Sequence, residues 1–400
     1  MGLQPFANAL LLRSDEAEER YPLSLSWCRE CGLVQLNETA SPEELFSDYV
    51  WVTGTSSTAR QYAECFCEEA LRRFGGRGGG YVLEAASNDG TFLRPFIRRG
   101  HRVVGVDPAA NIVDSAIREG VPTKCGFFGS SVAEEIVGES GPADIVFARN
   151  VLPHVADVHD FLDGLAMCMD AETLLAVEVH YAGVILEELH YDSIYHEHLC
   201  YFTLASLENL LGRHGLKAFD MLRSPISGGS IVVFARKAPA EASEALDRLR
   251  DLEAARGINE VRQWIDFACR ARAHCGRLVG LVHEEKAAGR RVAGYGASAR
   301  SSTLLNFCGI DNRVIDAIAD GNPLKHGRFT PGTHIGVDSP GNVIGTGAET
   351  VLLLAWNFEE EIAGILRDEL GFGGRIIAPL PNEPRVYSLG ACHAAGSRTD

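Results

Sequence analysis

Two histidines flank a glutamate in the string Tyr195-His196-Glu197-His198, inside the densest cluster of polar side chains in the chain, residues 191–202. A histidine exchanges its proton near neutral pH, and a neighbouring carboxylate can orient its ring or bind a substrate hydroxyl. These residue types at this spacing are typical of general acid–base catalysis. The string therefore predicts an active site that removes a proton from its substrate.

Two other interpretations of this string stay open. His196 and His198 lie two positions apart, so only an extended or loop segment points both rings in one direction. With His180 or His190 as a third ligand, the same residues could bind a metal ion. Alternatively, the string is a hydrogen-bonded part of the protein core.

The loop that follows Glu84, residues 85–90, is a second candidate site. The next predicted strand ends at Asp107, and an acidic residue at that place can bind the two hydroxyls of a ribose. The loop lacks clustered glycines, and Glu84 and Asp89 would repel a pyrophosphate. The pattern therefore favours S-adenosylmethionine, which has a ribose and no phosphate. The alternative is an ordinary strand-to-helix turn capped by Asn88 or Asp89.

Asn150 and His154 follow the predicted strand 143–148, and we expect them at the same sheet edge as this loop. His154 is therefore a second candidate catalytic histidine, with a purely structural role as the alternative. The polar and aromatic segment 46–49, which ends at Tyr49, and residues 54–56 either cover this crevice or form an exposed loop. The residues predicted to bind the methyl donor are Glu84, Ser87, Asn88, Asp89, Gly90, Asp107 and Asn150.

The motif Gly294-x-Gly296-x-x-Ala299 follows an apolar strand and opens a helix. Backbone N–H groups and the helix dipole at such a turn favour a phosphate group, and residues 320–334 add local positive charge. The motif predicts a ligand with a pyrophosphate; the alternatives are a dehydrogenase-type dinucleotide site and a simple tight turn. The residues predicted to bind this ligand are Tyr295, Gly296, Ser298, Arg300 and Lys325.

Alternating strands and helices must position these loops. Predicted strands at 81–84, 102–107, 143–148 and 173–179 alternate with helical segments, which is typical of a parallel doubly wound α/β sheet. Residues 240–288 predict a helical connector interrupted only at Gly257 and Gly276. The predicted division is 1–70 for a small N-terminal module, 71–238 for a donor-binding domain, 239–290 for the connector, 291–388 for a second Rossmann-like domain and 389–400 for a disordered tail.

The N-terminal module contains one tight pair of cysteines, Cys28 and Cys31, whose CxxC turn lets two thiolates face one metal ion. Structural zinc is bound by four ligands. Cys65 and Cys67 are spaced CxC on a predicted helix, and no pair of histidines lies nearby. The pattern predicts half of a zinc ribbon, which is either part of a zinc site or a metal-free knuckle.

Composition narrows the classes of function. The chain has 400 residues, a formal charge of -17, 46% hydrophobic residues and 23% charged residues, which indicates two or three folded domains and excludes nucleic acid as the main partner. No apolar run reaches about 18 residues, and the N-terminus lacks a basic signal region, so we expect neither export nor a membrane span. The 11 cysteines are odd in number and scattered, which predicts a reduced, cytoplasmic setting.

Several of these motifs together resemble one family, the S-adenosylmethionine-dependent C-methyltransferases that act on nucleotide-linked keto-deoxysugars in antibiotic sugar biosynthesis. The likeness covers nearly the whole chain, and Tyr195-His196-Glu197-His198 with the following Tyr201-Phe202 is its most specific part. The other matching motifs are Leu3-Gln4-Pro5-Phe6-Ala7-Asn8, Tyr21-Pro22-Leu23, Cys28-x-x-Cys31-Gly32, Glu84-x-x-Ser87-Asn88-Asp89-Gly90, Gly228-Gly229-Ser230, Gly294-Tyr295-Gly296-Ala297 and Leu354-Ala355-Trp356-Asn357.

The resemblance implies a zinc module, a class I methyltransferase domain and a C-terminal Rossmann-like domain that holds the nucleotide of the sugar. It implies that His198 is the base that removes the proton next to a keto group, with Tyr195, Glu197, His154 and Tyr49 shaping the pocket. The enolate then attacks the methyl group of the sulfonium donor. The resemblance implies that the methylated carbon is C-3 of a dTDP-4-keto-6-deoxysugar.

The chain departs from this family at two places. The family carries a first CxxC ahead of the Leu3-Gln4-Pro5 segment, and this chain starts too late to contain it, so we expect either an incomplete zinc site or a trimmed start. The family has His-Gly-Gly-Ser where this chain has residues 227–230, Ser-Gly-Gly-Ser, which indicates a changed sugar substituent or a diverged substrate. We expect a monomer or a small homo-oligomer.

Three rival functions stay open. A methyltransferase of another small metabolite would use the same donor domain and would not bind a nucleoside diphosphate. An NAD(P)-dependent oxidoreductase built on the segment 294–299 would reduce its cofactor and ignore the methyl donor. A non-catalytic protein would bind ligands without turnover.

Overall fold

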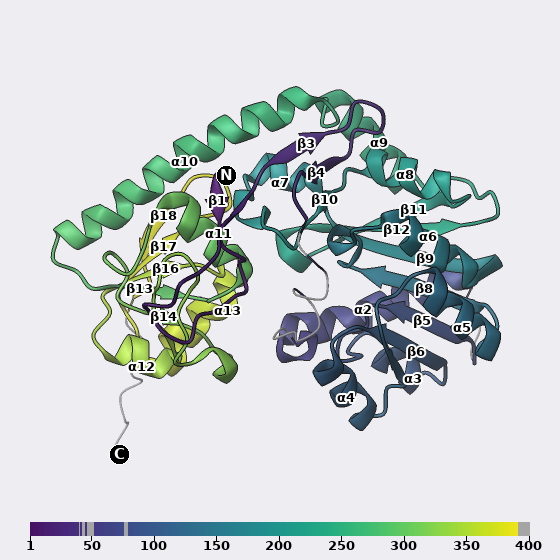
Figure 1. Ribbon diagram of the computed structural model, residues 1–400, viewed down its shortest axis with the longest axis horizontal. Coiled ribbons are helices and arrows are strands. Elements are labelled where there is room, and N and C mark those ends of the chain that lie inside the picture. The colour runs from purple at the N-terminus through teal and green to yellow at the C-terminus, as the bar shows by residue number, and fades with distance from the viewer. Residues whose placement is uncertain (40, 42–44, 46–51, 76–78, 391–400) are drawn as a thin grey trace, which may run out of the picture. The chain divides into compact units, whose positions relative to one another are not determined.

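The computed structural model describes residues 1–39, 41, 45, 52–75 and 79–390 (Figure 1). Tyr49 and all but the first two residues of the predicted tail 389–400 lie outside the described residues. The chain forms two compact units, each built from separate segments. Leu25–Gly183 and Glu197–Glu260 form one, and Met1–Ser24, Val184–His196 and Val261–Asp400 form the other. We call them the seven-stranded unit and the six-stranded unit after their main sheets.

The seven-stranded unit is built on a sheet with the strand order β11-β12-β9-β8-β5-β6-β7. Strands β7, β6, β5, β8 and β9 run parallel, whereas β12 is antiparallel to both β9 and β11. This is the doubly wound α/β arrangement that the alternating sequence pattern predicts. The elements of this unit are β3 (Leu25–Trp27), β4 (Val34–Leu36), η1 (Thr53–Thr55), α2 (Ser57–Phe74), β5 (Tyr81–Ala85), α3 (Arg94–Arg98), β6 (Arg102–Asp107), α4 (Ala110–Arg118), β7 (Thr123–Cys125), α5 (Ser130–Ser140), β8 (Ala143–Arg149), η2 (Leu152–His154), α6 (Val158–Met167), β9 (Met169–His180), β10 (Cys200–Tyr201), α8 (Leu204–Arg213), β11 (Lys217–Ser224), η4 (Ile226–Gly228), β12 (Ser230–Arg236) and α9 (Glu244–Arg256).

The core of this unit explains why its strands carry continuous apolar runs. Every residue of β5 is buried, as expected for a central strand covered on both faces. Ser56 caps helix α2 by accepting a hydrogen bond from the Ala59 N–H, and the helix buries one apolar stripe. The rings of Phe66 and Phe147 lie 5.1 Å apart in this core. Packing of these rings fixes the sheet whose strand ends carry the predicted donor loop.

The six-stranded unit contains the second α/β sheet, with the order β15-β14-β13-β16-β17-β18. All neighbouring strands are parallel except β18, which is antiparallel to β17. The elements of this unit are β1 (Leu3–Gln4), β2 (Tyr21–Pro22), most of α7 (Ala182–Glu188), η3 (Tyr191–Ser193), α10 (Val261–Ala287), β13 (Val292–Tyr295), α11 (Ala299–Cys308), β14 (Ile318–Ala319), η5 (Pro323–Lys325), β15 (Val337–Asp338), α12 (Pro340–Gly345), β16 (Thr350–Leu353), η6 (Trp356–Phe358), α13 (Glu359–Gly364), η7 (Ile365–Glu369), β17 (Arg375–Ala378) and β18 (Arg385–Ser388).

The predicted helical connector consists of two helices. Helix α9 ends at Gly257, which adopts the left-handed conformation with φ +60° and closes the helix. Gly276 was expected to interrupt the helix, but it lies inside the 27-residue helix α10, the long green helix of Figure 1. Nothing lies within 4 Å of the place where a Cβ of Gly276 would be, so the helix passes through it without a packing constraint. None of the described helices is long and apolar enough to cross a membrane.

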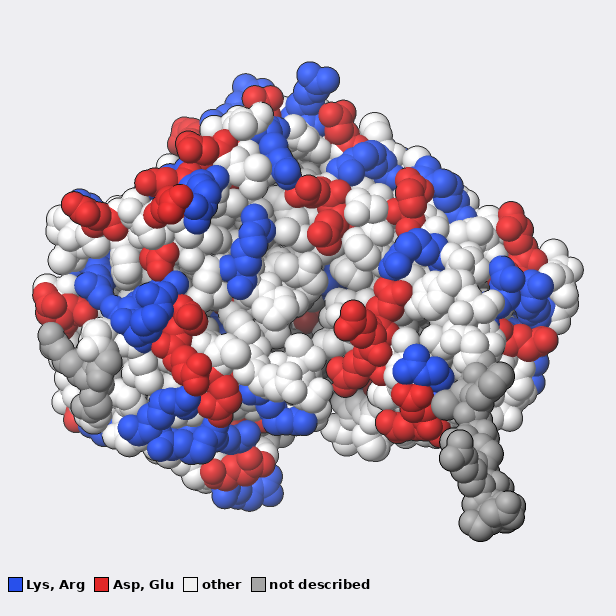
Figure 2. Space-filling view, turned by 180° about the vertical axis from the view of Figure 1, so that it is seen from behind, with Lys and Arg blue, Asp and Glu red and all other residues white. Residues whose placement is uncertain are grey.

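Charged side chains of both signs are interspersed over the face of the protein in Figure 2. Ion pairs occur within this mixture, including Arg98 and Arg99 with Glu64. Such exposed pairs contribute little to stability, because water and salt screen them. The net charge of -17 is therefore the balance of 54 acidic and 37 basic residues.

Candidate active site

The predicted donor loop lies at the carboxyl end of β5 and is tied to the end of β6. The Ser87 N–H donates to the Val106 carbonyl (2.9 Å), and the Asn88 N–H donates to Oδ2 of Asp107 (2.8 Å). Asn88 and Gly90 adopt left-handed conformations with φ of 48° and 74°. A Cβ at Gly90 would lie 2.7 Å from the Val121 side chain, so only glycine fits without movement.

Glu84 and Ser87 bring buried polar atoms into this loop. Oε2 of Glu84 and Oγ of Ser87 have no hydrogen-bond partner among the described residues. Burial raises the pKa of Glu84 well above its usual value, an effect that the nearby Arg149 opposes. A buried oxygen without a partner is costly unless a ligand supplies a donor, so these atoms fit a ligand with hydroxyl or amino groups such as S-adenosylmethionine.

Asp107 lies at the end of β6, at the position expected for a ribose-binding carboxylate. It is 6% exposed, and its two oxygens accept backbone hydrogen bonds from Asn88 and Ala109 (2.8 and 3.0 Å). Burial raises its pKa, and the two backbone hydrogen bonds oppose that rise. Each carboxylate oxygen can accept more than one hydrogen bond, so this arrangement holds Asp107 in place and leaves acceptor capacity for a ribose.

The side chains of Asn88 and Asp89 hold the segment that precedes α2. The Thr53 N–H donates to Oδ1 of Asn88 (2.9 Å), and the Gly54 N–H donates to Oδ2 of Asp89 (3.2 Å). The described part of the polar segment predicted to cover the crevice therefore contacts the donor loop. Tyr49, the residue of that segment predicted to shape the pocket, is outside the described residues.

A buried ion pair that the sequence analysis did not identify lies at the ends of β8 and β9. Nη2 of Arg149 contacts Oε2 of Glu178 at 2.7 Å, and the two side chains are 8% and 0% exposed. The Arg149 guanidinium lies 3.0 Å from the centre of the Phe92 ring, and Ser224 donates to Oε1 of Glu178 (2.5 Å). The sequence contained a signal for each of the two residues, because each strand places a charged residue after an apolar run. It contained no signal for their pairing.

His154 and His198 are brought together within the seven-stranded unit. Their ring centres are 4.8 Å apart, and the Tyr201 ring lies 6.5 Å from that of His198. Nδ1 of His154 lies 2.7 Å from the Glu197 carbonyl oxygen, which can only accept, so Nδ1 carries the proton. Although part of His154 stays accessible, burial lowers its pKa to about 4. His154 is therefore neutral at neutral pH.

Asn150 supports this pair from the end of β8. It adopts a left-handed conformation with φ 49°, and its N–H donates to the Glu178 carbonyl (2.8 Å). A backbone group of Asn150 also hydrogen-bonds the His154 ring. Asn150 thus places His154 through its backbone, whereas its predicted contact with the donor remains a prediction.

Tyr195 and His196 belong to the six-stranded unit, whereas Glu197 and His198 belong to the seven-stranded unit. Tyr195 packs with Ala7 and Ala299. The His196 ring lies against Phe6, and its Nε2 is 3.1 Å from the Pro22 carbonyl oxygen. Hence the His196 ring and the His198 ring lie in different surroundings. Among the described residues, no three His, Cys, Asp or Glu side chains form a group that could hold a metal ion.

The second glycine loop is shaped as the sequence predicts, between β13 and α11. Gly296 has φ +98°, and a Cβ there would lie 2.5 Å from the Cβ of Ala355. Ser298 caps α11 by accepting a hydrogen bond from the Ser301 N–H (3.2 Å). Tyr295 is the last residue of β13 and is 6% exposed.

The two predicted cations of this loop are paired with carboxylates. Nζ of Lys325 donates to the Ala297 carbonyl (2.8 Å) and to Oδ2 of Asp320 (3.1 Å). The same Asp320 oxygen accepts from the Ala297 N–H (2.8 Å). Arg300 forms a two-bond ion pair with Asp192 (2.8 and 2.9 Å). The charges of Arg300 and Lys325 are thus matched inside the unit.

The sequence analysis gave no individual role to three residues of this region, Asp192, Asp320 and Trp356. Asp320 directly follows β14, and Asp107 is the last residue of β6, so the same strand-end pattern could have identified Asp320. Asp192 and Trp356 gave no such signal, because their partner Arg300 is distant in the sequence. Only the fold brings Asp192 and Trp356 into contact with Arg300.

The cysteine pair lies on the turn between β3 and β4. The Cys28 N–H donates to the Leu33 carbonyl (2.8 Å), and Gly32, with φ +71°, donates to the Cys28 carbonyl (3.0 Å). Zinc in a structural site takes four ligands, and among the described residues no group of three or more His, Cys, Asp or Glu side chains that could hold a metal forms around this pair. The described residues therefore do not make a complete zinc site.

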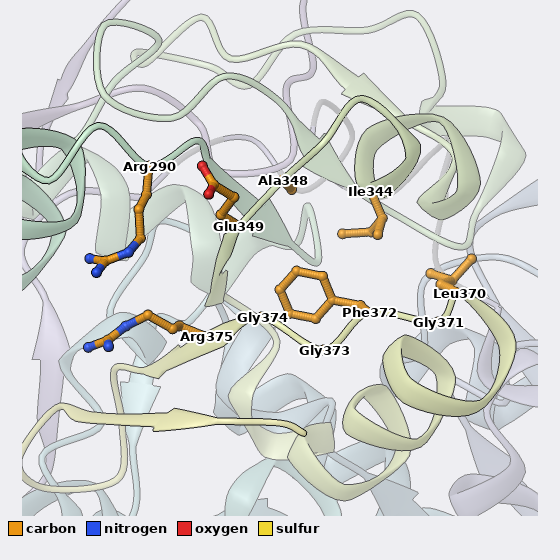
Figure 3. Close-up of a pocket in the computed structure, with 10 residues that line it drawn as sticks. All are labelled: Arg290, Ile344, Ala348, Glu349, Leu370, Gly371, Phe372, Gly373, Gly374 and Arg375. Atoms are coloured by element: carbon orange, nitrogen blue, oxygen red, sulfur yellow. The ribbon is translucent and has the colours of Figure 1, made fainter. Parts of the chain in front are cut away.

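A hollow of about 480 Å³ opens elsewhere in the six-stranded unit (Figure 3). Its residues precede or begin β13, β16 and β17, so it lies at the opposite strand ends from the glycine loop. Arg290 and Arg375 line one side of it, and both contact Glu285 at 3.1 Å. None of the predicted site residues lines this hollow.

Comparison with protein families divides the chain into three parts. A model described as "Putative zinc binding domain" matches residues 1–46, one described as "Methyltransferase domain" matches residues 59–219, and one described as "C-methyltransferase C-terminal domain" matches residues 225–381. These matches confirm the predicted fold class: a class I methyltransferase sheet, a second C-terminal sheet domain and an N-terminal zinc-binding-type module.

Relatives along the chain are also methyltransferases. The C-methyltransferase NovU of Streptomyces niveus is 37% identical over 391 residues, which cover 97% of this chain and 93% of that protein. The ubiquinone biosynthesis O-methyltransferase of Bartonella tribocorum is 29% identical over 97 residues, or 24% of this chain and 39% of that protein.

Solved structures cover a smaller part. The magnesium protoporphyrin IX methyltransferase of Synechocystis PCC 6803, solved with bound SAM, has a TM-score of 0.35 and 15% identity, and the match covers 45% of this chain and 79% of that one. The relationship over nearly the full length of NovU is decisive. The chain belongs to the family of S-adenosylmethionine-dependent C-methyltransferases.

Proposed function

We propose that this enzyme methylates a carbon of a nucleotide-linked keto-deoxysugar, C-3 of a dTDP-4-keto-6-deoxysugar, through base-catalysed formation of an enolate. The observation that carries the proposal is the cluster of His154, His198 and Tyr201, with the Glu197 carbonyl fixing the His154 ring. A C-methyltransferase needs a base, because a proton beside a keto group does not leave unaided.

His198 is the base in this proposal. It takes the proton from the carbon next to the keto group and becomes an imidazolium. His154, 4.8 Å away, is neutral because its pKa is about 4, so it does not repel that new charge. Glu197, Tyr195 and Tyr49 remain the other residues proposed to shape the pocket.

The methyl donor is proposed to bind at the loop after β5. S-adenosylmethionine, when bound, supplies a methyl group on a cationic sulfur. Glu84 and Ser87 would hydrogen-bond its donor groups, and Asp107 would accept from its ribose hydroxyls. The proposed donor site is shaped by four further residues, Asn88, Asp89, Gly90 and Asn150. Asn88 and Asp89 accept hydrogen bonds from the backbone of η1, and Gly90 permits the tight turn.

The nucleotide of the sugar is proposed to bind the glycine loop of the six-stranded unit. Tyr295, Gly296 and Ser298 form that loop, and its helix N-terminus favours a phosphate. Arg300 and Lys325 are the nearby cations. Because each is paired with a carboxylate, we expect them to hold the loop in shape as well as to favour the phosphate.

Mass spectrometry tests the proposal. The purified protein would be incubated with methyl-deuterated S-adenosylmethionine and a panel of dTDP-linked 4-keto-6-deoxysugars. We expect one sugar to gain the labelled methyl group. Donor binding without transfer to any sugar would indicate a methyltransferase of another metabolite, and reduction of a nicotinamide cofactor without donor binding would indicate an oxidoreductase.

A further inference from the structure

Asp192 is a buried carboxylate of the six-stranded unit with three N–H donors around it. Its Oδ1 accepts from Nη2 of Arg300 (2.8 Å), and its Oδ2 accepts from Nε of Arg300 (2.9 Å) and Nε1 of Trp356 (2.8 Å). The Asp192 side chain is 1% exposed. A carboxylate at this depth is stable only when its charge is matched and its oxygens are bonded. We call these three residues the Asp192 clamp.

The Asp192 clamp joins three segments that are far apart in the sequence. Asp192 lies in η3, Arg300 in the first turn of α11, and Trp356 at the start of η6, the next element after β16. The Arg300 guanidinium also lies 4.6 Å from the centre of the Trp356 ring. A planar two-bond pair that stacks on an indole has one geometry, so the clamp fixes orientation as well as distance.

Two residues adjacent to the clamp in sequence, Ala299 and Ala355, contact residues of the proposed site. Tyr195, three residues after Asp192, packs on Ala299, which directly precedes Arg300. Ala355, which directly precedes Trp356, touches the space that a Cβ of Gly296 would need, and its N–H donates to the Tyr295 carbonyl (3.0 Å). The residues adjacent to the clamp therefore contact both Tyr195 and the nucleotide loop.

We propose that Asp192 is a positioning residue for methyl transfer: through Arg300 and Trp356 it fixes Tyr195 and the nucleotide loop in one arrangement. This rests on the proposed function, which places Tyr195 in the pocket and the nucleotide on the loop 294–300. Arg300 acts here through its geometry, because Asp192 already matches its charge.

The first test is Asp192→Asn in the full chain. The change keeps the side-chain shape but removes the charge and turns an acceptor into an N–H group that faces Arg300. We expect kcat for the sugar nucleotide to fall at least tenfold, a smaller change in KM, and a dissociation constant for S-adenosylmethionine within twofold of wild type. Asp311→Asn is the matched control, because Asp311 also binds an arginine with both oxygens (2.9 and 3.1 Å), but this arginine, Arg313, has a side chain that is 83% exposed.

Milder variants keep the test valid if Asp192→Asn fails to fold. Trp356→Phe retains a ring and removes one donor, and Arg300→Lys retains the charge and removes the two-bond pairing. We expect kcat to fall about threefold to tenfold in each. In a cycle of Trp356→Phe and Arg300→Lys, the combined loss should be smaller than the product of the single losses, because both act on one carboxylate.

Hydrogen–deuterium exchange separates this proposal from the proposed function. We expect Asp192→Asn or Trp356→Phe to speed exchange in both 190–196 and 296–304 and to leave 102–125 unchanged. If wild type methylates no sugar nucleotide, the proposed function fails and this exchange pattern alone decides about the clamp. Unchanged exchange in 296–304, a kcat equal to wild type in an active enzyme, or multiplicative losses in the cycle would overturn the clamp.

Discussion

His154 donates a hydrogen bond from Nδ1 to the Glu197 carbonyl oxygen at 2.7 Å, which places its ring 4.8 Å from that of His198. The contact joins η2, at the end of β8, to the histidine string before β10. The Leu199 N–H reinforces it by donating to the Pro153 carbonyl (2.7 Å). The position of the proposed base thus depends on backbone atoms on both sides.

Removing the base tests its role directly. His198→Asn keeps a polar side chain but cannot accept the substrate proton at neutral pH. We expect turnover to fall by about 10²-fold to 10⁴-fold, the range typical of a lost general base, while the dissociation constant of S-adenosylmethionine stays nearly the same. Single-turnover kinetics and calorimetry measure the two quantities. Near-normal turnover would remove His198 from this role.

The pKa of His154 makes stability depend on pH. Its pKa falls from 6.5 in the unfolded chain to about 4 in the fold, so its contribution to stability is present above pH 6.5 and is lost as the pH falls toward 4. The shift corresponds to at most about 3 kcal/mol. His190, His196 and His274 also have lowered pKa values and act in the same direction.

The variant His154→Gln isolates this effect, because it cannot take up a proton in that range. We expect its free energy of unfolding to change less between pH 7 and about pH 4 than that of wild type. Urea unfolding at a series of pH values measures the difference. Equal slopes in both proteins would show that His154 is not kept neutral by the fold.

Glu84→Gln separates donor binding from stability. Burial raises the pKa of Glu84, so the charged form destabilises the fold as the pH rises, and an amide removes that cost. We expect affinity for S-adenosylmethionine to fall about tenfold while the melting temperature stays equal or rises. Calorimetry and thermal melting measure both. A lower melting temperature with unchanged affinity would indicate that Glu84 is structural.

Gly296→Ala tests the nucleotide loop. A Cβ would lie 2.5 Å from that of Ala355, and the φ of +98° is unfavourable for alanine, so the loop must move. We expect binding of dTDP to weaken at least tenfold and donor binding to persist. Gly276→Ala is the control: it lies inside α10 with open space around it, and we expect it to stabilise the protein by roughly 0.5–1 kcal/mol. If both variants bind dTDP as wild type does, the nucleotide binds elsewhere.

The sequence predicted the two glycine-containing loops well, because their signals are local. A strand, a short turn and a helix cap lie within a few residues, as at Ser298, and left-handed positions such as Gly90 and Gly296 mark the turns. The CxxC turn at Cys28 is equally local. Such features do not depend on how distant segments meet.

Contacts between segments that are distant in the chain could not be predicted from the sequence pattern. Nothing in the string 191–198 indicates that it divides after His196 between two compact units. The pairs Arg149 with Glu178 and Arg300 with Asp192 depend on which strand ends and helix ends become neighbours. The linear boundaries near residues 70, 238 and 290 and the oligomeric state remain predictions.

The central claim is that the methyl group is attached to a sugar carbon. The most direct measurement is nuclear magnetic resonance of the product made from ¹³C-methyl S-adenosylmethionine and a dTDP-4-keto-6-deoxysugar labelled with ¹³C in its ring. The proposal predicts a one-bond carbon–carbon coupling between the new methyl group and C-3. A labelled methyl group without that coupling, attached to oxygen or nitrogen, would contradict it.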